Sequence, residues 1–201
     1  MCLKISLCVN FFKPLGLILK NLWKQAENSS DNSRMEKVAK YLKDNTSKII
    51  QEIIKANPMQ YSGAAKFLWS CNQIDHALAK QIVNEITYKL VNKFRTWPSV
   101  YREVGQLINA YHEIDPCLSL SFIENNRVQG KIQQSINTDD WSKEIEGLKY
   151  LIKAFYRSAP DLWKKMVKLD WIYVDLNSLD LNSIYREVDE EKNIGTAHNT
   201  T

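Results

Sequence analysis

The residues that could take part in catalysis are few and scattered. Histidines occur at positions 76, 112 and 198, and His112 has two acidic residues close to it, Glu113 and Asp115. An imidazole beside a carboxylate is an arrangement that general acid–base catalysis uses. Asp115 is followed by Pro116, however, and an aspartate before a proline is typical of a helix start. The cluster around His112 is therefore better explained by a helix cap.

The remaining reactive groups form no catalytic or metal-binding pattern either. The four cysteines lie at positions 2, 8, 71 and 117, and no two of them form a CxxC pair. This spacing argues against a zinc site or a disulfide framework and fits a reducing cytoplasm. Cys71 lies among apolar residues and is expected to be a buried small hydrophobe. The sequence has no GxGxxG, HExxH or GxSxG motif. We therefore expect no enzyme, no cofactor and no metal.

One pattern of apolar residues recurs three times along the chain. The windows 61–86, 101–126 and 145–170 align without gaps, with starts 40 and 44 residues apart. In the first half of each window apolar residues fall at i, i+3, i+4 and i+7, which makes one stripe on a helix. The second half carries apolar residues at i, i+4 and i+5, which also fits one face of a helix. The first-half stripes are Ala64, Phe67, Leu68 and Cys71, then Val104, Leu107, Ile108 and Tyr111, and then Leu148, Leu151, Ile152 and Phe155. Each window thus predicts a helix pair.

The step between the two helices falls at the same place in each window. It is Asp75-His76, Asp115-Pro116 and Ala159-Pro160. Aspartate at an N-cap accepts a free backbone N–H, and proline at the first helical position has no N–H to leave unpaired. In the third window, where Ala159 replaces the aspartate, we expect Ser158 to act as the cap.

The repeat sets the expected domain organisation. Units start near positions 57, 97, 141 and 181, because residues 183–188 nearly duplicate 99–104, and the repeat array spans 57–188. The segments from Thr87 and from Arg127 either extend the second helix or form a short third one. Residues 1–56 are expected to form N-terminal helices, with a degenerate first repeat as one interpretation. The polar tail 189–201 is expected to be disordered.

The most apolar stretch, residues 5–22, leaves three interpretations open. Lys13, Pro14 and Lys20 interrupt it, so no uncharged run reaches the roughly 20 residues that a membrane-spanning helix needs. A core helix, a membrane-surface anchor and a targeting peptide are the alternatives.

These helix pairs resemble the repeats of HEAT- and armadillo-like α-solenoids, which have a period of about 40 to 45 residues. More specifically, they are similar to the repeat arrays that follow the NTPase module in bacterial and archaeal STAND-type signalling ATPases. The resemblance covers residues 57–188 well and 14–56 poorly. It implies an all-α fold, a short right-handed α-solenoid of helix pairs, that acts as a sensor or scaffold surface. The phosphate-binding GxxxxGK[ST] loop of that NTPase is absent from the sequence.

A protein-interaction scaffold in the cytoplasm is therefore the expected function, and off-stripe residues supply its candidate surface. These are Trp69, Lys80, Trp163, Lys164, Lys165 and Lys168. An aromatic side chain among lysines is typical of an interaction hot spot, although packing between neighbouring units would also explain Trp163. We further expect exposed apolar surface, and hence self-association or a protein partner, at residues 160–188, where the array ends.

Charge suggests an alternative partner. The chain carries a net charge of +4, with 15 basic and 7 acidic residues in 1–100 but 12 basic and 16 acidic residues in 101–201. A basic N-terminal half fits electrostatic binding of nucleic acid or of an acidic membrane surface.

Overall fold

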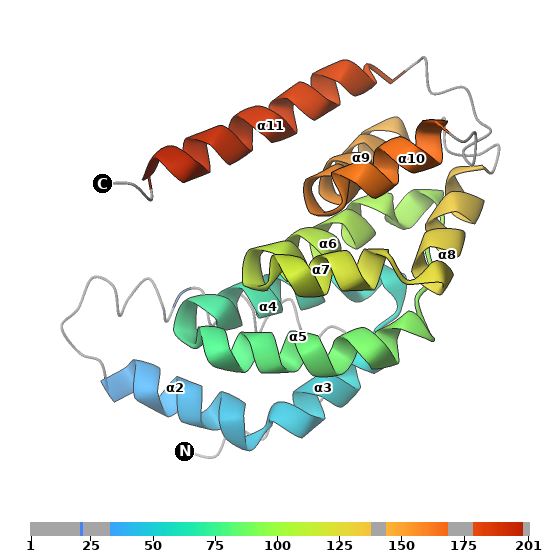
Figure 1. Ribbon diagram of the computed structural model, residues 1–201. Coiled ribbons are helices and arrows are strands. Elements are labelled where there is room, and N and C mark those ends of the chain that lie inside the picture. Colours follow the sequence, from blue (N-terminus) through green and yellow to red (C-terminus); the bar gives the residue numbers. More distant parts are fainter. Residues whose placement is uncertain (1–20, 22–32, 138–143, 169–178, 199–201) are drawn as a thin grey trace.

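The computed structural model describes residues 21, 33–137, 144–168 and 179–198 (Figure 1). These residues form ten α-helices and two short 3₁₀-helices, with no strand among them, so the expected all-α class is confirmed. The helices are α2 (Ser33–Asp44), α3 (Thr46–Lys55), η1 (Pro58–Gln60), α4 (Tyr61–Ile74), α5 (His76–Val91), η2 (Pro98–Val100), α6 (Tyr101–Ile114), α7 (Pro116–Ile123), α8 (Asn126–Ile136), α9 (Ile145–Ser158), α10 (Pro160–Lys168) and α11 (Leu181–His198).

The predicted helix pairs lie in two layers. Helix α4 packs against α6, α6 against α9, and α9 against α11 (Figure 1). Helices α5 and α7 pack against each other on the other side, and α10 continues that side against α9. Helix α8 lies at one edge of the two layers. The first helix of each repeat window therefore contacts the first helix of the next.

The apolar stripes form the core between these helices. Phe67, Leu107 and Leu151 occupy equivalent positions in α4, α6 and α9, and none is more than 1% exposed. Fully burying one such side chain contributes about 1.5–3 kcal/mol relative to leaving it in water. One continuous cluster of buried residues runs from α2 to α11. The stripes therefore hold the successive helix pairs together.

Two of the three predicted caps are confirmed. Asp75 Oδ1 accepts the backbone N–H of Leu78 at 3.0 Å and starts α5. Asp115 Oδ1 accepts the N–H groups of Cys117 at 2.9 Å and Leu118 at 3.2 Å and starts α7. Asp115 itself is only 8% exposed, and the loss of these bonds would leave two N–H groups of the first turn of α7 without their cap.

Ser158 has a different role from the expected cap of α10. Its hydroxyl lies 2.9 Å from Ser119 Oγ in α7 and 3.4 Å from Nδ1 of His112 in α6. The same junction in the other two repeats carries an ion pair, from Lys43 to Asp75 at 2.9 Å and from Lys80 to Asp115 at 2.6 Å. Each second helix is thus preceded by a polar link to the neighbouring repeat.

The sequence left open whether the segments after the second helices extend those helices or form a short third helix, and the structure contains one example of each. The segment from Thr87 extends α5 as far as Val91, whereas the segment from Arg127 lies in the separate helix α8. The start of the third unit near 141 and the apolar stretch 5–22, except residue 21, lie outside the described residues.

The C-terminal segment differs from the disordered tail expected from residue 189. Helix α11 continues to His198, and residues 199–201 lie outside the described part of the chain. Asp189 accepts a hydrogen bond from the Tyr156 hydroxyl at 3.4 Å, and Glu191 forms an ion pair with Arg157. These contacts with α9 stabilise a helix whose sequence is too polar to predict one.

Gly105 sets the approach of α6 to α9. A Cβ atom at this position would lie 2.7 Å from Cδ1 of Tyr150 and 3.2 Å from the backbone Cα of Leu151. We predict that Gly105→Ala lowers the free energy of unfolding by about 1–3 kcal/mol, because the two helices must separate.

The matched control is Gly130→Ala in α8, where nothing lies within 4 Å of the added Cβ. There the higher helix propensity of alanine should raise the free energy of unfolding by up to about 1 kcal/mol. Urea denaturation of both variants measures the difference. Stabilisation by both substitutions would contradict the close α6–α9 contact.

Candidate interaction surfaces

The structure does not bring the six candidate surface residues together. Trp69 lies on α4, where it lines a pocket with residues of α6 and α9. Lys80 lies on α5, and the other four residues lie on α10, in the second layer of helices. The six residues predicted to form one surface therefore lie on three different helices.

Trp163 is buried and is not a surface residue. Its side chain is 0% exposed, its ring lies 5.5 Å from that of Phe155, and its indole N–H donates to the Tyr185 hydroxyl at 2.8 Å. The equivalent positions Ala79 and Ser119 are also 0% exposed. Alanine and serine are found both on protein surfaces and where helices pack closely, so the sequence alone does not distinguish the two cases. In this structure Ala79 and Ser119 allow close helix packing. The packing interpretation of Trp163 is the correct one.

The lysine candidates are exposed, and several of them have local partners. Lys80 is paired with Asp115. The Lys164 ammonium lies 5.4 Å from the centre of the Tyr156 ring, within the range of a cation–π contact. Lys165 and Lys168 are also exposed on α10. The outer side of α10 thus presents a basic strip without an exposed aromatic side chain.

The pocket around Trp69 has a volume of about 330 Å³ and is formed by α4, α6 and α9. We call it the Trp69 pocket, and its main lining residues are Lys66, Trp69, Gln106, Asn109, Glu113 and Tyr150. Trp69 is half-buried. Glu113 lies 3.7 Å from Arg157, and Asn109 Nδ2 donates to the Tyr150 hydroxyl at 3.4 Å. The pocket combines aromatic surface with amide groups and one charge of each sign.

Two side-chain oxygens of this pocket have no hydrogen-bond partner. They are Gln106 Oε1 and Asn109 Oδ1, and both are shielded from solvent. A buried acceptor without a partner costs about 1–3 kcal/mol, and such groups are uncommon in folded proteins. The sequence indicates these two residues only in part, because Asn109 aligns with Trp69 outside the apolar stripe. The pocket itself arises from the packing of three helices, which the sequence does not show.

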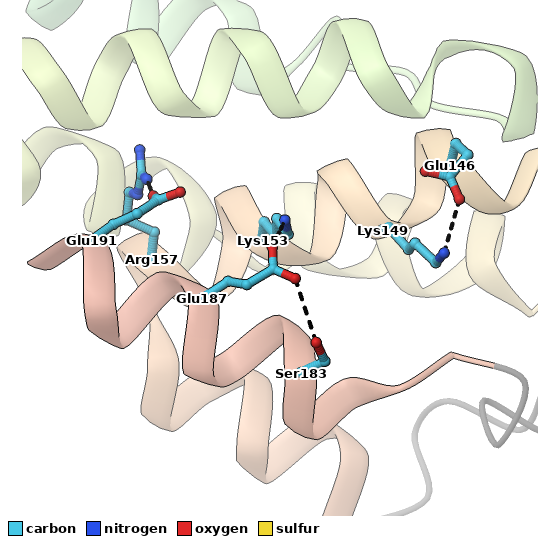
Figure 2. A network of polar contacts seen from close by, with 7 residues as sticks. All are labelled: Glu146, Lys149, Lys153, Arg157, Ser183, Glu187 and Glu191. Atoms are coloured by element: carbon cyan, nitrogen blue, oxygen red, sulfur yellow. Dashed lines mark hydrogen bonds and ion pairs between the residues drawn. The ribbon is translucent and has the colours of Figure 1, made fainter.

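The C-terminal end of the array is covered by α11 through a seam of polar contacts. Figure 2 shows Lys153 of α9 paired with Glu187 of α11, and Arg157 paired with Glu191 one turn further along. Ser183 donates to Glu187 at 3.4 Å. The Lys153 ammonium keeps the pKa of Glu187 below its ordinary value, mainly through their hydrogen bond.

Apolar contacts complete this seam. The rings of Tyr156 and Tyr185 stack with centres 4.5 Å apart, and Ile184 and Val188 are at most 4% exposed. Within the described residues of 160–188, no large hydrophobic side chain is exposed. The described apolar residues of 160–188 are therefore covered, in part by α11. Residues 169–178 lie outside the described part of the chain, so self-association at 160–188 stays a prediction.

Cys71 is buried in the described part of the chain. Burial raises the pKa of the Cys71 thiol to about 12, so this cysteine is the inert core residue that the sequence predicts. No group of three histidine, cysteine, aspartate or glutamate side chains in the described part of the chain could hold a metal ion. Among the same residues, no helix is both long and apolar enough to cross a membrane.

Comparison with protein-family models, with curated proteins and with solved structures found no match to this chain. Its function must therefore be inferred from the arrangement and chemistry of its own residues.

The Asp115 carboxylate links a candidate surface lysine to the fold and gives a pH-dependent prediction. The hydrogen bond from Lys80 and the backbone N–H groups of Leu118 and Cys117 lower its pKa from the ordinary 3.8. The stabilisation is present above the unfolded-state pKa and is lost as the pH falls through the lower folded-state pKa. Asp115→Ala should lower the free energy of unfolding by about 1–2 kcal/mol near pH 7, with a smaller difference from wild type near pH 3.

Urea denaturation at both pH values measures this effect. Lys80→Ala is the control, because it removes the exposed lysine of the ion pair but keeps the Asp115 cap, and it should cost less than about 1 kcal/mol. A difference between Asp115→Ala and wild type that stays constant with pH would show that the carboxylate charge does not stabilise this junction.

Proposed function

We propose that this chain is a non-catalytic protein-interaction module, a short right-handed α-solenoid of helix pairs whose Trp69 pocket is its binding site for a protein partner. The equivalent first helices of successive repeats, α4, α6 and α9, pack against one another, and this supports the solenoid. A scaffold or sensor role like that of the repeat arrays in STAND-type ATPases is part of the same proposal.

The two unpaired oxygens, Gln106 Oε1 and Asn109 Oδ1, carry the proposal. In the free chain they are desolvated without compensation. A partner that shifts a covering side chain and brings N–H or O–H donors would supply the missing hydrogen bonds. Donors of this kind are present in any polypeptide backbone, which favours a protein ligand.

Trp69 supplies the second part of the binding site. A half-buried indole offers a large contact area with few rotatable bonds, and tryptophan is enriched among residues that dominate binding energy. The neighbouring charges of Lys66 and Glu113 have opposite sign, so they give orientation to a partner rather than a general attraction.

Quantitative affinity capture from the source cells, with the full chain as bait, tests this proposal. Trp69→Ala should reduce recovery of the specific partner by about 30-fold or more. Gln106→Met keeps the shape of the side chain and removes the unpaired acceptor, so it should weaken capture while leaving the free energy of unfolding equal or up to about 1 kcal/mol higher.

Tyr88→Ala is the matched control, because Tyr88 is 70% exposed on α5 and does not line the pocket. It should leave recovery of the partner unchanged. Capture that is the same for wild type, Trp69→Ala and Gln106→Met would refute the pocket as the binding site. A Gln106→Met variant that is less stable than wild type would show that the amide oxygen is paired.

A further inference from the structure

A second surface feature, unrelated to the Trp69 pocket, lies at the edge of the molecule where α3 and α5 end beside α8 (Figure 1). It is a groove of about 990 Å³ lined by residues of the segments 54–58, 92–98 and 131–135. We call it the basic groove, because its charged lining residues are Lys55, Lys93, Arg95 and Lys131 and none of its described lining residues is acidic. Three segments distant in sequence thus converge on one electropositive site.

Among the residues that the structure describes, an acidic partner is found for Lys55 but not for the other three cations. Lys55 lies 3.5 Å from Glu52, and Lys131 donates to Gln134 at 3.5 Å. Lys93 and Arg95 are exposed and form no ion pair with any residue that the structure describes. Like charges gathered in a concave site repel one another and attract an anion. The groove is therefore suited to a ligand that carries several negative charges.

Trp97 identifies the kind of anion. It lines the groove two residues after Arg95 and is 38% exposed, although indoles are usually well buried. Aromatic side chains next to cations are what proteins use to bind single-stranded nucleic acid, where a base stacks on the ring and the phosphates contact lysine and arginine. A nucleic-acid strand offers a ring for the indole at every nucleotide, whereas an acidic peptide of aspartate and glutamate offers none. A base in a duplex is already stacked and paired, so it could not use the ring.

The groove also contains a polar group without a hydrogen-bond partner, together with two side-chain amides. Thr96 Oγ1 lines the groove, is shielded from solvent and has no hydrogen-bond partner. The amide of Gln134 and that of Asn57 flank the cations. These groups can bond to sugar hydroxyls or to base edges.

We propose that the basic groove binds single-stranded nucleic acid, with phosphates on Lys93 and Arg95 between Lys55 and Lys131, and with one base stacked on Trp97. The sequence predicts polyanion binding by the basic N-terminal half as a whole, and this proposal assigns it to one site. The site also includes Lys131, a residue of the second half. It is independent of the Trp69 pocket.

Fluorescence anisotropy with a labelled, mixed-sequence RNA of about 12 nucleotides tests the proposal. The logarithm of affinity should fall with the logarithm of salt concentration with a slope of about −3, as expected for four phosphate contacts on a single strand. In the double variant Lys93→Ala and Arg95→Ala, binding should be weaker and the slope shallower by about 1.4. Trp97→Ala should lose about 5- to 150-fold in affinity with an unchanged slope, and Trp97→Phe should recover part of that loss.

The matched control removes the same charge elsewhere. Lys48 and Lys89 are exposed and do not line the groove, so Lys48→Ala with Lys89→Ala should leave the salt slope unchanged. Circular dichroism and thermal unfolding establish that each variant is folded. Absence of RNA binding at low salt would overturn the proposal, as would an equal loss in the control.

Two competitors separate nucleic acid from other anions. A polyglutamate peptide and anionic phospholipid vesicles are added at matched negative charge. RNA binding that neither competitor displaces supports the proposal. Polyglutamate or vesicles that bind as tightly as RNA, with Trp97→Ala unaffected, would assign the groove to another class of anion and overturn it.

Discussion

The contact between the first helices of successive repeats is the constraint on which the rest of the structure depends. Helices α4, α6 and α9 pack side by side because each carries its apolar residues at the same spacing. Gly105 lets α6 approach α9 closely enough for Tyr150 to lie across it. Both the Trp69 pocket and the position of α11 depend on this arrangement, since both are built on α9. A change in the spacing of these helices would therefore alter the binding surface.

The helices and their starts could be predicted from sequence because they depend on local interactions. The stripe through Phe67, Leu107 and Leu151 and the caps at Asp75 and Asp115 each involve residues a few positions apart. The tail could not be predicted in this way. Its polar residues predict disorder, but ion pairs and a tyrosine stack with α9, about 30 residues earlier in the chain, hold α11 as a helix.

The candidate surface is less predictable, because exposure is set by neighbours that the repeat pattern does not identify. Trp163 shares its alignment position with Ala79 and Ser119, and all three are buried where helices approach closely. The amide oxygens of Gln106 and Asn109 become unpaired only when three helices enclose them. Two regions with different chemistry result. The Trp69 pocket contains unpaired acceptors, and the basic groove contains four cations of which Lys55 has an acidic partner among the described residues.

The side-by-side packing of equivalent helices is the central claim, and nuclear Overhauser contacts across the α6–α9 interface test it most directly. The α-protons of Gly105 should show strong contacts with the ring protons of Tyr150, 45 residues later in the chain, because the two groups touch. Contacts from Gly105 only to its own helix would contradict the stacking of α6 on α9, and with it the proposed solenoid and its pocket.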